Sequence, residues 1–307
     1  MSSSATCGER NRWEKPERFL RRRMYGERIR TVLRKWTAVL LLLLLLIAAM
    51  PAMAELRVSF LDVGQGDAIV LNCDGETLLI DAGPADAGGR VNRYLKDHGF
   101  CELKAVIATH SHDDHIGGMP AALTGISVGS VYSSRTVPLL YWFDTVQPVL
   151  AQSGLDVNFP ERNDTVQVGN AIVTVLSTDD PALSVNNRST VVRVDYGSTS
   201  FLLMGDAEGD EETALLTGGA ELKADVLKLG HHGGIGSTGM SLLDAVRPEL
   251  AVISVGANND HGHPAAETLA LLEVRGIRTC RTDILGTVTC ISDGEKFTVE
   301  VEKVTGY

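Results

Sequence analysis

The sequence predicts an α/β fold in which two β-rich halves are each covered by helices on the outer face, a four-layer αβ/βα sandwich. Three observations support this prediction. From residue 55 onward, short apolar runs alternate with Gly, Asp and Asn; strand-like and helix-like segments alternate along the chain; and no low-complexity linker divides it. We therefore expect one domain over residues 55–307.

The first half of this domain is predicted to begin as a meander of short strands. The expected strands cover residues 56–61, 68–72 and 77–80. A helix-like stretch at 90–97 and a buried strand at 105–108 follow. In layered α/β folds, sites gather at the carboxyl ends of strands, so the loop after Ala108 is well placed to carry functional groups.

The second half is predicted to alternate strands with helices in the same way. Its expected strands cover residues 171–176, 190–194, 201–204, 225–229 and 250–254. Its expected helices cover residues 211–216, 242–246 and 267–275. The alternation of both element types favours helices packed on a sheet over an all-β barrel.

Residues 1–54 do not resemble part of a folded core. Thr37–Met50 is nearly uninterrupted apolar sequence, basic residues precede it, and Ala52-Met53-Ala54 follows it, which is typical of a signal peptide. The apolar run is shorter than the roughly 20 residues that span a bilayer. We expect cleavage after Ala54, with an uncleaved N-terminal anchor as the alternative. The cleaved protein is then secreted or extracytoplasmic, without a stable membrane domain.

Removal of residues 1–54 makes the charge balance strongly acidic. The whole chain has 28 basic and 39 acidic residues, and the first 54 residues hold 11 and 4 of them, which leaves 17 and 35, a net charge of −18. Such a charge repels the nucleic-acid backbone at long range, although bound divalent metals can override this inside a cleft. Nucleic acid is therefore a possible partner that the charge does not favour.

Four cysteines belong to the expected domain: Cys73, Cys101, Cys280 and Cys290. Their number is even and none has a metal-ligand spacing, so disulfides are the natural interpretation in an oxidising compartment. Cys280 and Cys290 flank a turn between two strand-like runs, and a hairpin would place them opposite one another. Cys73 would then pair with Cys101. Four buried thiols are the alternative.

Seven of the eight histidines fall into three tight groups. The groups are His110, His112 and His115; His231 and His232; and His261 and His263. His98 stands outside them. Neither His98 nor His261 has a supporting pattern, so we expect both on the surface.

The first group lies in the segment THSHDDH, residues 109–115, directly after a predicted strand. A turn there lets imidazoles and a carboxylate converge, and these are the nitrogen and oxygen ligands that zinc-class ions bind. Gly117 and Gly118 follow and let the next helix begin close against the turn. A solvated polar loop or a single structural ion is the alternative.

Two further strand ends carry ligands of the same kind. Asp206 follows the predicted strand at 201–204, and His231 and His232 follow the one at 225–229. Three strand ends that are distant in the sequence thus supply metal-type ligands. This pattern favours a metal centre over a chance cluster.

These segments, with several shorter motifs, resemble the metallo-β-lactamase superfamily. Within it they resemble the extracytoplasmic hydrolase domain of the ComEC/Rec2-type DNA-uptake proteins and their free-standing relatives, over almost all of residues 56–303. The matching segments are FLDVGQGDA (60–68), LIDAG (79–83), the histidine turn, GDAE (205–208), KLGHHG (228–233), GHP (262–264) and TD (282–283). The resemblance implies the metallo-β-lactamase fold and two divalent metal ions, zinc or manganese.

The resemblance also implies a set of ligands. The set consists of His110 and His112 for the first metal, Asp114, His115 and His232 for the second, and Asp206 as a bridge between the two. His231 is the alternative to His232. Asp67 and Asp81 lie in the matching motifs and are expected beside the ligands or the substrate, with Asp81 orienting the ligand turn. A helix or turn cap is the alternative for Asp81.

The chain departs from the superfamily pattern at one ligand position. Most members place a histidine on the first metal at a position that aligns near residues 186–189, where this chain, like the ComEC-type proteins, has Asn186 and Ser189. An amide oxygen is a weaker and harder ligand than imidazole. The first site is therefore expected to bind its ion loosely or to prefer manganese.

A late loop is expected to reach the cleft. It contains Asn258 and His263, and His263 could protonate a leaving oxygen or bind a phosphate. A structural hydrogen bond is the alternative for both.

Two cations about 3.5 to 4 Å apart would share a water and present a bridging hydroxide at neutral pH, which indicates hydrolysis. We expect Asp114 and His263 to take part in catalysis. The resemblance favours an exported phosphodiesterase acting on a small or polymeric phosphodiester. The alternatives are an extracellular DNA nuclease linked to DNA uptake and a non-catalytic binding module with a degenerate metal site; hydrolysis of β-lactams ranks lower.

Overall fold

The computed structural model describes residues 35–37, 55–177 and 179–303. The chain divides into two units, Met1–Ala52 and Met53–Tyr307. The predicted signal peptide and its cleavage site lie outside the described residues, except for the short helical stretch at 35–37. Within the described ranges, no helix has both the length and the apolar character needed to cross a membrane.

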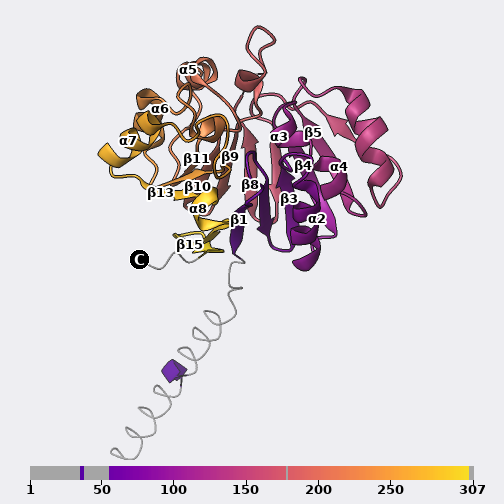
Figure 1. Ribbon diagram of the computed structural model, residues 1–307. Helices are drawn as coiled ribbons and strands as arrows, with labels where there is room; N and C mark the ends of the chain where they lie inside the picture. The colour runs from indigo at the N-terminus through magenta and orange to yellow at the C-terminus, as the bar shows by residue number, and fades with distance from the viewer. Residues whose placement is uncertain (1–34, 38–54, 178, 304–307) are drawn as a thin grey trace, which may run out of the picture. The chain divides into compact units, whose positions relative to one another are not determined.

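Within the described part of the second unit, the strands form two sheets (Figure 1). The first sheet has eight strands in the order β15-β14-β1-β2-β3-β4-β5-β6. Their bounds are β1 Leu56–Phe60, β2 Ile69–Cys73, β3 Glu76–Ile80, β4 Glu102–Ala108, β5 Ser127–Ser133, β6 Val157–Asn158, β14 Val288–Ser292 and β15 Phe297–Val301. β1, the first strand of the domain, thus lies between β2 and the late strand β14.

The second sheet has seven strands in the order β13-β12-β11-β10-β9-β8-β7. Their bounds are β7 Thr165–Val168, β8 Ala171–Val175, β9 Val192–Tyr196, β10 Thr199–Leu203, β11 Val226–Lys228, β12 Leu250–Ile253 and β13 Arg278–Arg281. β10 and β12 bury apolar side chains on both faces, as expected for strands covered from both sides.

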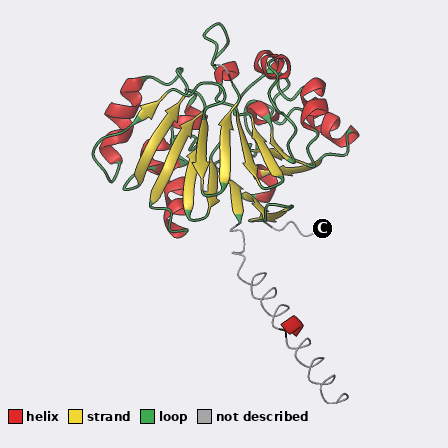
Figure 2. Cartoon of the chain, turned by 180° about the vertical axis from the view of Figure 1, so that it is seen from behind, coloured by secondary structure: helices red, strands yellow, loops and turns green. Residues whose placement is uncertain are grey.

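Helices lie along the outer faces of the sheets (Figure 2). The α-helices are α2 Gly88–Asp97, α3 Asp113–Ile116, α4 Met119–Ala122, α5 Gly209–Thr217, α6 Met240–Val246, α7 Ala266–Val274 and α8 Thr282–Leu285. Short 3-10 and π segments are η1 Tyr141–Val146, η2 Gln147–Val149, η3 Asn186–Arg188 and η4 Gly230–Gly233. In α2, for example, Val91 and Leu95 are four residues apart and both buried, so one apolar stripe faces the sheet.

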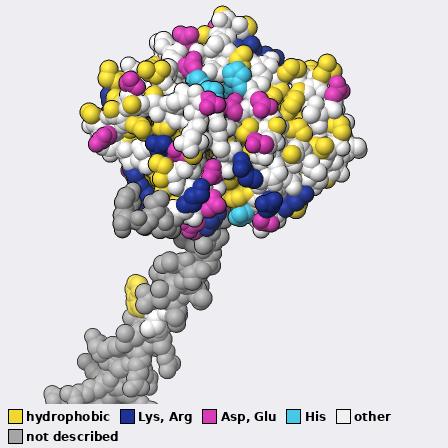
Figure 3. Space-filling model, in the orientation of Figure 1, with side chains coloured by type: hydrophobic (Ala, Val, Ile, Leu, Met, Phe, Trp, Pro, Cys, Tyr) yellow, Lys and Arg dark blue, Asp and Glu magenta, His cyan; other side chains and the backbone are white. Residues whose placement is uncertain are grey.

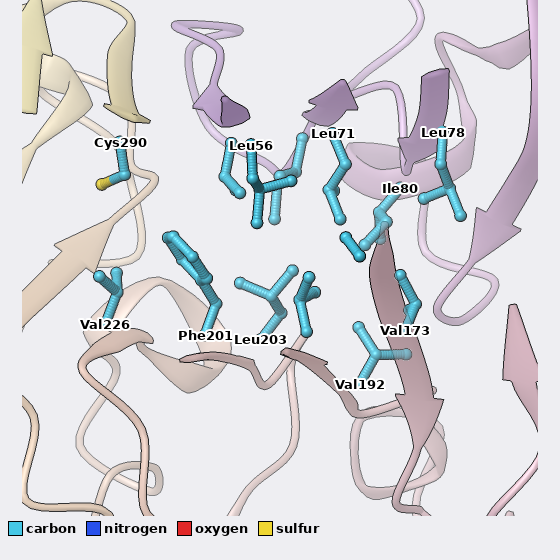
Figure 4. Packing of buried hydrophobic residues seen from close by; sticks show 14 of the residues in the cluster. Leu56, Leu71, Leu78, Ile80, Val173, Val192, Phe201, Leu203, Val226 and Cys290 are labelled. Carbon is cyan, nitrogen blue, oxygen red and sulfur yellow. The ribbon is translucent and has the colours of Figure 1, made fainter. Parts of the chain in front are cut away.

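Three apolar clusters define the layers. The central one fills the space between the sheets, where Leu71 and Ile80 of the first sheet face Val192, Phe201 and Leu203 of the second (Figure 4). The other two join the outer face of each sheet to its helices. The predicted four-layer αβ/βα sandwich is therefore confirmed.

Both sheets send loops toward one end of the domain. β3, β4 and β5 pair in parallel, and so do β10, β11 and β12. The histidine turn follows β4, Asp206 follows β10, and His231 follows β11. Parallel neighbours end at the same edge of their own sheet, and the packing of the two sheets places the edge with the histidine turn beside the edge with Asp206 and His231.

The hairpin predicted around Cys280 and Cys290 is wrong. Both flanking segments are strands, but β13 belongs to the second sheet and β14 to the first, with α8 between them. Both cysteines are buried in the central cluster between the sheets. The four described cysteines carry free thiols, with Cys73 buried and Cys101 exposed. Disulfide pairing therefore remains a prediction, and comparing the mass of the protein with and without reductant tests it.

Candidate metal centre

The histidine turn is held against two other loops by close backbone contacts. A Cβ on Gly118 would lie 2.1 Å from the carbonyl oxygen of Ala82, and one on Gly66 would lie 2.1 Å from that of Asp114. Only glycine allows these approaches. The Asp67 amide then donates to the Asp114 carbonyl at 3.2 Å. Gly66 of the segment 60–68 and Gly118, which follows the histidine turn, thus fix the turn relative to the sheet.

Four donor groups meet in what we call the second half-site: Asp114, His115, His232 and one oxygen of Asp206. Nε2 of His115 lies 3.2 Å from Asp206 Oδ1, and Nε2 of His232 lies 3.4 Å from the same oxygen. Asp114 Oδ2 is 3.2 Å from His232 Nε2. Three strand ends therefore contribute to one half-site, as predicted.

The first half-site contains His110, His112 and the other oxygen of Asp206. Nε2 of His110 lies 3.0 Å from Nδ1 of His112 and 3.6 Å from Asp206 Oδ2. The structure thus brings together all six predicted ligands, with the two oxygens of Asp206 facing different half-sites.

The donor atoms fit a bound cation. Nε2 of His115 and Oδ1 of Asp206 are buried, lie 3.2 Å apart, and yet form no hydrogen bond with any described group. Buried polar atoms are normally paired, so both atoms are poised for a shared third partner. Ligand atoms around a tetrahedral zinc ion lie about 3.3 Å apart, given metal–nitrogen distances of about 2.0–2.1 Å. The observed separations match this spacing.

The charges of the centre also call for a cation. Burial would lower the pKa of His115, but Asp206 and Asp81 raise it well above the ordinary value. Burial, with His115 nearby, holds the pKa of His110 well below it. Burial would raise the pKa of Asp206, but His115 and His232 hold it well below the usual range. In the absence of a metal ion, the carboxylates thus favour protonated imidazoles beside them, and a bound cation would take over the positive charge that these protons supply.

Buried partners fix the second half-site from behind. Nδ1 of His115 donates to Asp81 Oδ2 at 2.7 Å, and the Thr109 amide and hydroxyl donate to the same carboxylate at 2.9 and 2.6 Å. Nδ1 of His232 donates to the Ser254 carbonyl at 3.0 Å. With Nδ1 protonated in both rings, each Nε2 presents its lone pair to the half-site. Asp81 therefore lies where the sequence placed it, behind the ligand turn.

A buried ion pair lies behind His232. Lys228 Nζ, with no exposed side-chain surface, is 2.9 Å from Asp67 Oδ2, and Asp67 Oδ1 lies 3.4 Å from Nδ1 of His232. Burial would raise the pKa of Asp67, but Lys228 and His232 lower it well below the ordinary value. Sequence reasoning had selected Asp67 and missed Lys228, whose partner is distant in the chain.

The ligands of the first half-site have weaker hydrogen-bond partners behind them than those of the second. Nδ1 of His110 contacts the hydroxyl oxygens of Thr109 at 3.1 Å and Ser189 at 3.3 Å, and His112 is exposed. The side-chain amide of Asn186 donates to Glu208 Oε1 at 3.0 Å, and its Oδ1 is buried without a hydrogen-bond partner among the described groups. Sequence reasoning missed the role of Glu208, although it lies in the matching segment 205–208.

The late loop reaches the centre through His263. The ring of His263 lies 4.9 Å from that of His231, centroid to centroid. Burial, with His231 and His232 nearby, lowers the pKa of His263 to about 4. Asn258 itself is exposed with a positive φ, and Asn259 organises the loop instead, by bonding the backbone of Gly256 and His263.

An open cavity of about 820 Å³ lies over both half-sites. Its lining includes His112, Asp114, Asp206 and His231, with Arg90 as the one Lys or Arg in the lining. In Figure 3, histidine and acidic side chains gather at the upper part of the domain surface. His98 and His261 are exposed, as expected, although His261 also lines this cavity.

Comparison with known proteins agrees with this geometry. The model of the metallo-beta-lactamase superfamily matches residues 61–257. The ComE operon protein 3 of Bacillus subtilis (strain 168) is 32% identical over 255 residues, covering 76% of this chain and 33% of the relative. Competence protein ComA of Neisseria gonorrhoeae is 30% identical and covers 76% and 32%. The chain thus spans about a third of the length of these relatives.

Solved structures share the fold at low sequence identity. The metallo-beta-lactamase fold protein YhfI from Bacillus subtilis matches with a TM-score of 0.51 and 15% identity, covering 78% of this chain and 100% of its own. Igni18, a metallo hydrolase from Ignicoccus hospitalis, matches with a TM-score of 0.51 and 17% identity, covering 76% and 98%. With its fold, its His/Asp cluster and the matched family model, the chain belongs to the metallo-β-lactamase superfamily and resembles its ComEC-type members.

Proposed function

We propose that the protein is an exported, metal-dependent phosphodiesterase. One observation carries the proposal. Side chains from three sequence-distant loops form the two half-sites at the floor of an open cavity, and within each half-site their donor atoms lie within 4.8 Å of one another, as the ligands of one metal ion do. The proposed ligands are His110, His112, Asp114, His115, Asp206 and His232. Two divalent ions, zinc or manganese, would supply Lewis acidity and lower the pKa of a shared water when bound.

Side chains around the metal centre are placed to contact the attacking water and the substrate and to hold the ligands. Asp114 is the most exposed carboxylate of the second half-site and lines the cavity, so it can accept a proton from the attacking water. His263 lies beside His231 at the edge of the centre, and because its lowered pKa of about 4 leaves the ring neutral, it can donate its N–H as a hydrogen bond to a phosphate oxygen of the substrate. Asp81 and Asp67 hold the ligand imidazoles in place from behind.

The charge of the cavity favours a small phosphodiester or the end of a polymer. Asp86 and Asp113 line the cavity beyond the proposed ligands, and Arg90 is the one Lys or Arg in its lining. A long nucleic acid would face this acidic rim as well as the net charge of the domain. Arg90 can bind one phosphate oxygen without attracting a whole backbone.

The likeness to proteins named for competence supports a second candidate, an extracellular nuclease linked to DNA uptake. A nuclease would need metal ions bound in the cleft whose positive charge outweighs the repulsion between the acidic cavity lining and the DNA backbone. A binding module with a degenerate metal site is the third candidate, and the intact set of six converging donors argues against it.

An assay of the purified protein with zinc or manganese separates these functions. The substrates are bis-p-nitrophenyl phosphate, single-stranded DNA and a chromogenic β-lactam. We expect turnover of the first substrate, faster than of DNA, and none of the β-lactam. A protein that holds less than one ion per chain and hydrolyses none of them would favour the binding module.

The exported location is tested separately by the mature N-terminus. We expect the secreted protein to begin at Glu55. A protein that retains residues 1–54 in the membrane fraction would support the anchored form instead.

A further inference from the structure

His231 occupies a position that the second half-site does not explain. We propose that His231 is the third imidazole ligand of the first half-site and replaces the histidine that most superfamily members place near position 186. This inference rests on the metal centre of the proposed function. It assigns the two consecutive histidines to different ions.

The two oxygens of Asp206 separate the two histidines. Oδ1 faces the second half-site, at 3.4 Å from His232 Nε2. Oδ2 faces the first half-site, at 3.6 Å from His110 Nε2, and this same oxygen is the one that His231 Nε2 approaches, at 4.0 Å. His231 therefore lies on the side of Asp206 where an imidazole is missing.

The backbone explains how neighbouring residues reach opposite sides. His231 and His232 both have positive φ, 43° and 54°, in the left-handed region that residues with a Cβ rarely adopt. The His231 amide donates to the Gly205 carbonyl at 3.2 Å, which ties this strained turn to the loop of Asp206. Strain retained at such a point indicates a function for the side chains that it directs.

Glu208 gives His231 the orientation of a ligand. Nδ1 of His231 lies 2.7 Å from Glu208 Oε1, so a proton lies between these atoms and Nε2 presents its lone pair toward Asp206. Asn186 donates to the same oxygen at 3.0 Å, and Asn187 Oδ1 accepts from the Glu208 amide at 2.9 Å. The segment that lacks the usual histidine thus positions the carboxylate that orients its replacement.

The ring of His231 must move to complete the half-site. Its separation of 4.0 Å from Asp206 Oδ2 exceeds the spacing of about 3.3 Å between ligands of a tetrahedral ion by less than 1 Å, but the donor atoms that already lie within 4.8 Å of one another are those of His110, His112 and Asp206, so the ring must also approach the two histidines. His231 is part of the cavity lining, with 29% of its side chain exposed, so the ring has room to move.

Metal stoichiometry of purified protein variants tests the assignment. His231→Gly and His232→Gly form a matched pair, because glycine adopts the left-handed backbone of both positions without strain. Zinc and manganese per chain are measured by mass spectrometry after dialysis, and thermal unfolding verifies the fold. His98→Ala, which removes an exposed histidine that belongs to neither half-site, is the control.

We expect two ions in the unaltered protein and in His98→Ala, and one ion in each glycine variant. His231→Gly combined with His112→Ala still holds one ion, because both changes affect the first half-site, whereas His231→Gly combined with His232→Gly holds none. Glu208→Gln keeps His231 but lowers the affinity of the first half-site for its ion by about 10- to 100-fold.

Three outcomes overturn the inference: an unaltered protein with fewer than two ions, a His231→Gly variant that holds two ions with unchanged affinity, or loss of both ions when His231→Gly is combined with His112→Ala. The failure of the proposed function is distinct. A protein with two ions and this pattern of losses that does not cleave bis-p-nitrophenyl phosphate disproves the phosphodiesterase and leaves the assignment of His231 intact.

Discussion

The two half-sites share Asp206 but differ in what lies behind their ligands. In the second, His115 and His232 are fully buried and bonded to Asp81 and to the Ser254 carbonyl. In the first, His112 is exposed, and Nδ1 of His110, the nitrogen turned away from the half-site, contacts the hydroxyl oxygens of Thr109 and Ser189. A charged, buried partner orients a ligand more firmly than a hydroxyl does. The difference indicates one tightly held ion and one that exchanges more readily.

The change with the largest expected effect removes what the half-sites share. Asp206→Asn takes charge from both, so we expect loss of both ions and a fall in turnover of more than about a hundredfold, the upper end for loss of an outer partner alone. Metal analysis and hydrolysis of bis-p-nitrophenyl phosphate measure this. Asp244→Asn, on the surface of α6, is the control. Retention of one ion would show that the half-sites are independent.

The next effect concerns the support of the second half-site alone. Lys228→Met leaves the charge of Asp67 buried without its partner, and we expect a loss of about 3–5 kcal/mol in the free energy of unfolding. Urea denaturation of the metal-free protein measures it. Adding Asp67→Asn removes the stranded charge and recovers most of the stability. A single variant as stable as the unaltered protein contradicts the role given to this pair.

A matched pair of substitutions compares the hydrogen-bond partners behind the ligands of the two half-sites. Asp81→Asn is expected to lower the affinity of the second half-site for its ion by about 10- to 100-fold, because an amide at this position no longer orients His115 as the carboxylate does. Ser189→Ala removes a neutral contact to His110 and is expected to cost about 1 kcal/mol, or roughly fivefold, in the affinity for the first ion. Competition with a chelating dye gives both affinities. Equal losses would remove the distinction between the half-sites.

The last test needs no substitution. Titration of the two-ion protein with a chelator is expected to remove the ions in two steps separated by about tenfold or more in chelator concentration, since outer partners alter affinity by about 10- to 100-fold. Thermal unfolding at each step follows the loss, and the larger fall in melting temperature accompanies the second step. Removal of both ions in one step would mean that they bind cooperatively.

The sequence predicted the parts of the centre in which a ligand directly follows an apolar strand along the chain. The histidine turn, Asp206 and His232 each follow a strand of apolar residues. Parallel pairing places Asp206 and His232 at one edge of the second sheet, and the packing of the two sheets sets the histidine turn of the first sheet beside them. The long, apolar strands were predicted close to their observed bounds. β5, with Gly and Ser within it, and the two-residue β6 gave no clear pattern.

Partnerships between distant residues were beyond prediction. Lys228 and Asp67 are 161 positions apart, and nothing in either neighbourhood indicates the other. Glu208 binds His231 across a turn whose left-handed backbone the sequence does not reveal. The supposed hairpin of Cys280 and Cys290 failed for the same reason: α8 separates β13 from β14, and each strand finds its partners elsewhere.

The position of β1 has a consequence for how the domain is assembled. Leu56 pairs with Ser292, so the first strand of the domain gains its outer neighbour only when nearly the whole chain has been made. Until then the edge of β1 exposes unpaired amides and carbonyls that invite pairing with other chains. Such long-range closure slows folding. A nascent chain that stops before residue 288 is therefore expected to stay unfinished and prone to aggregate.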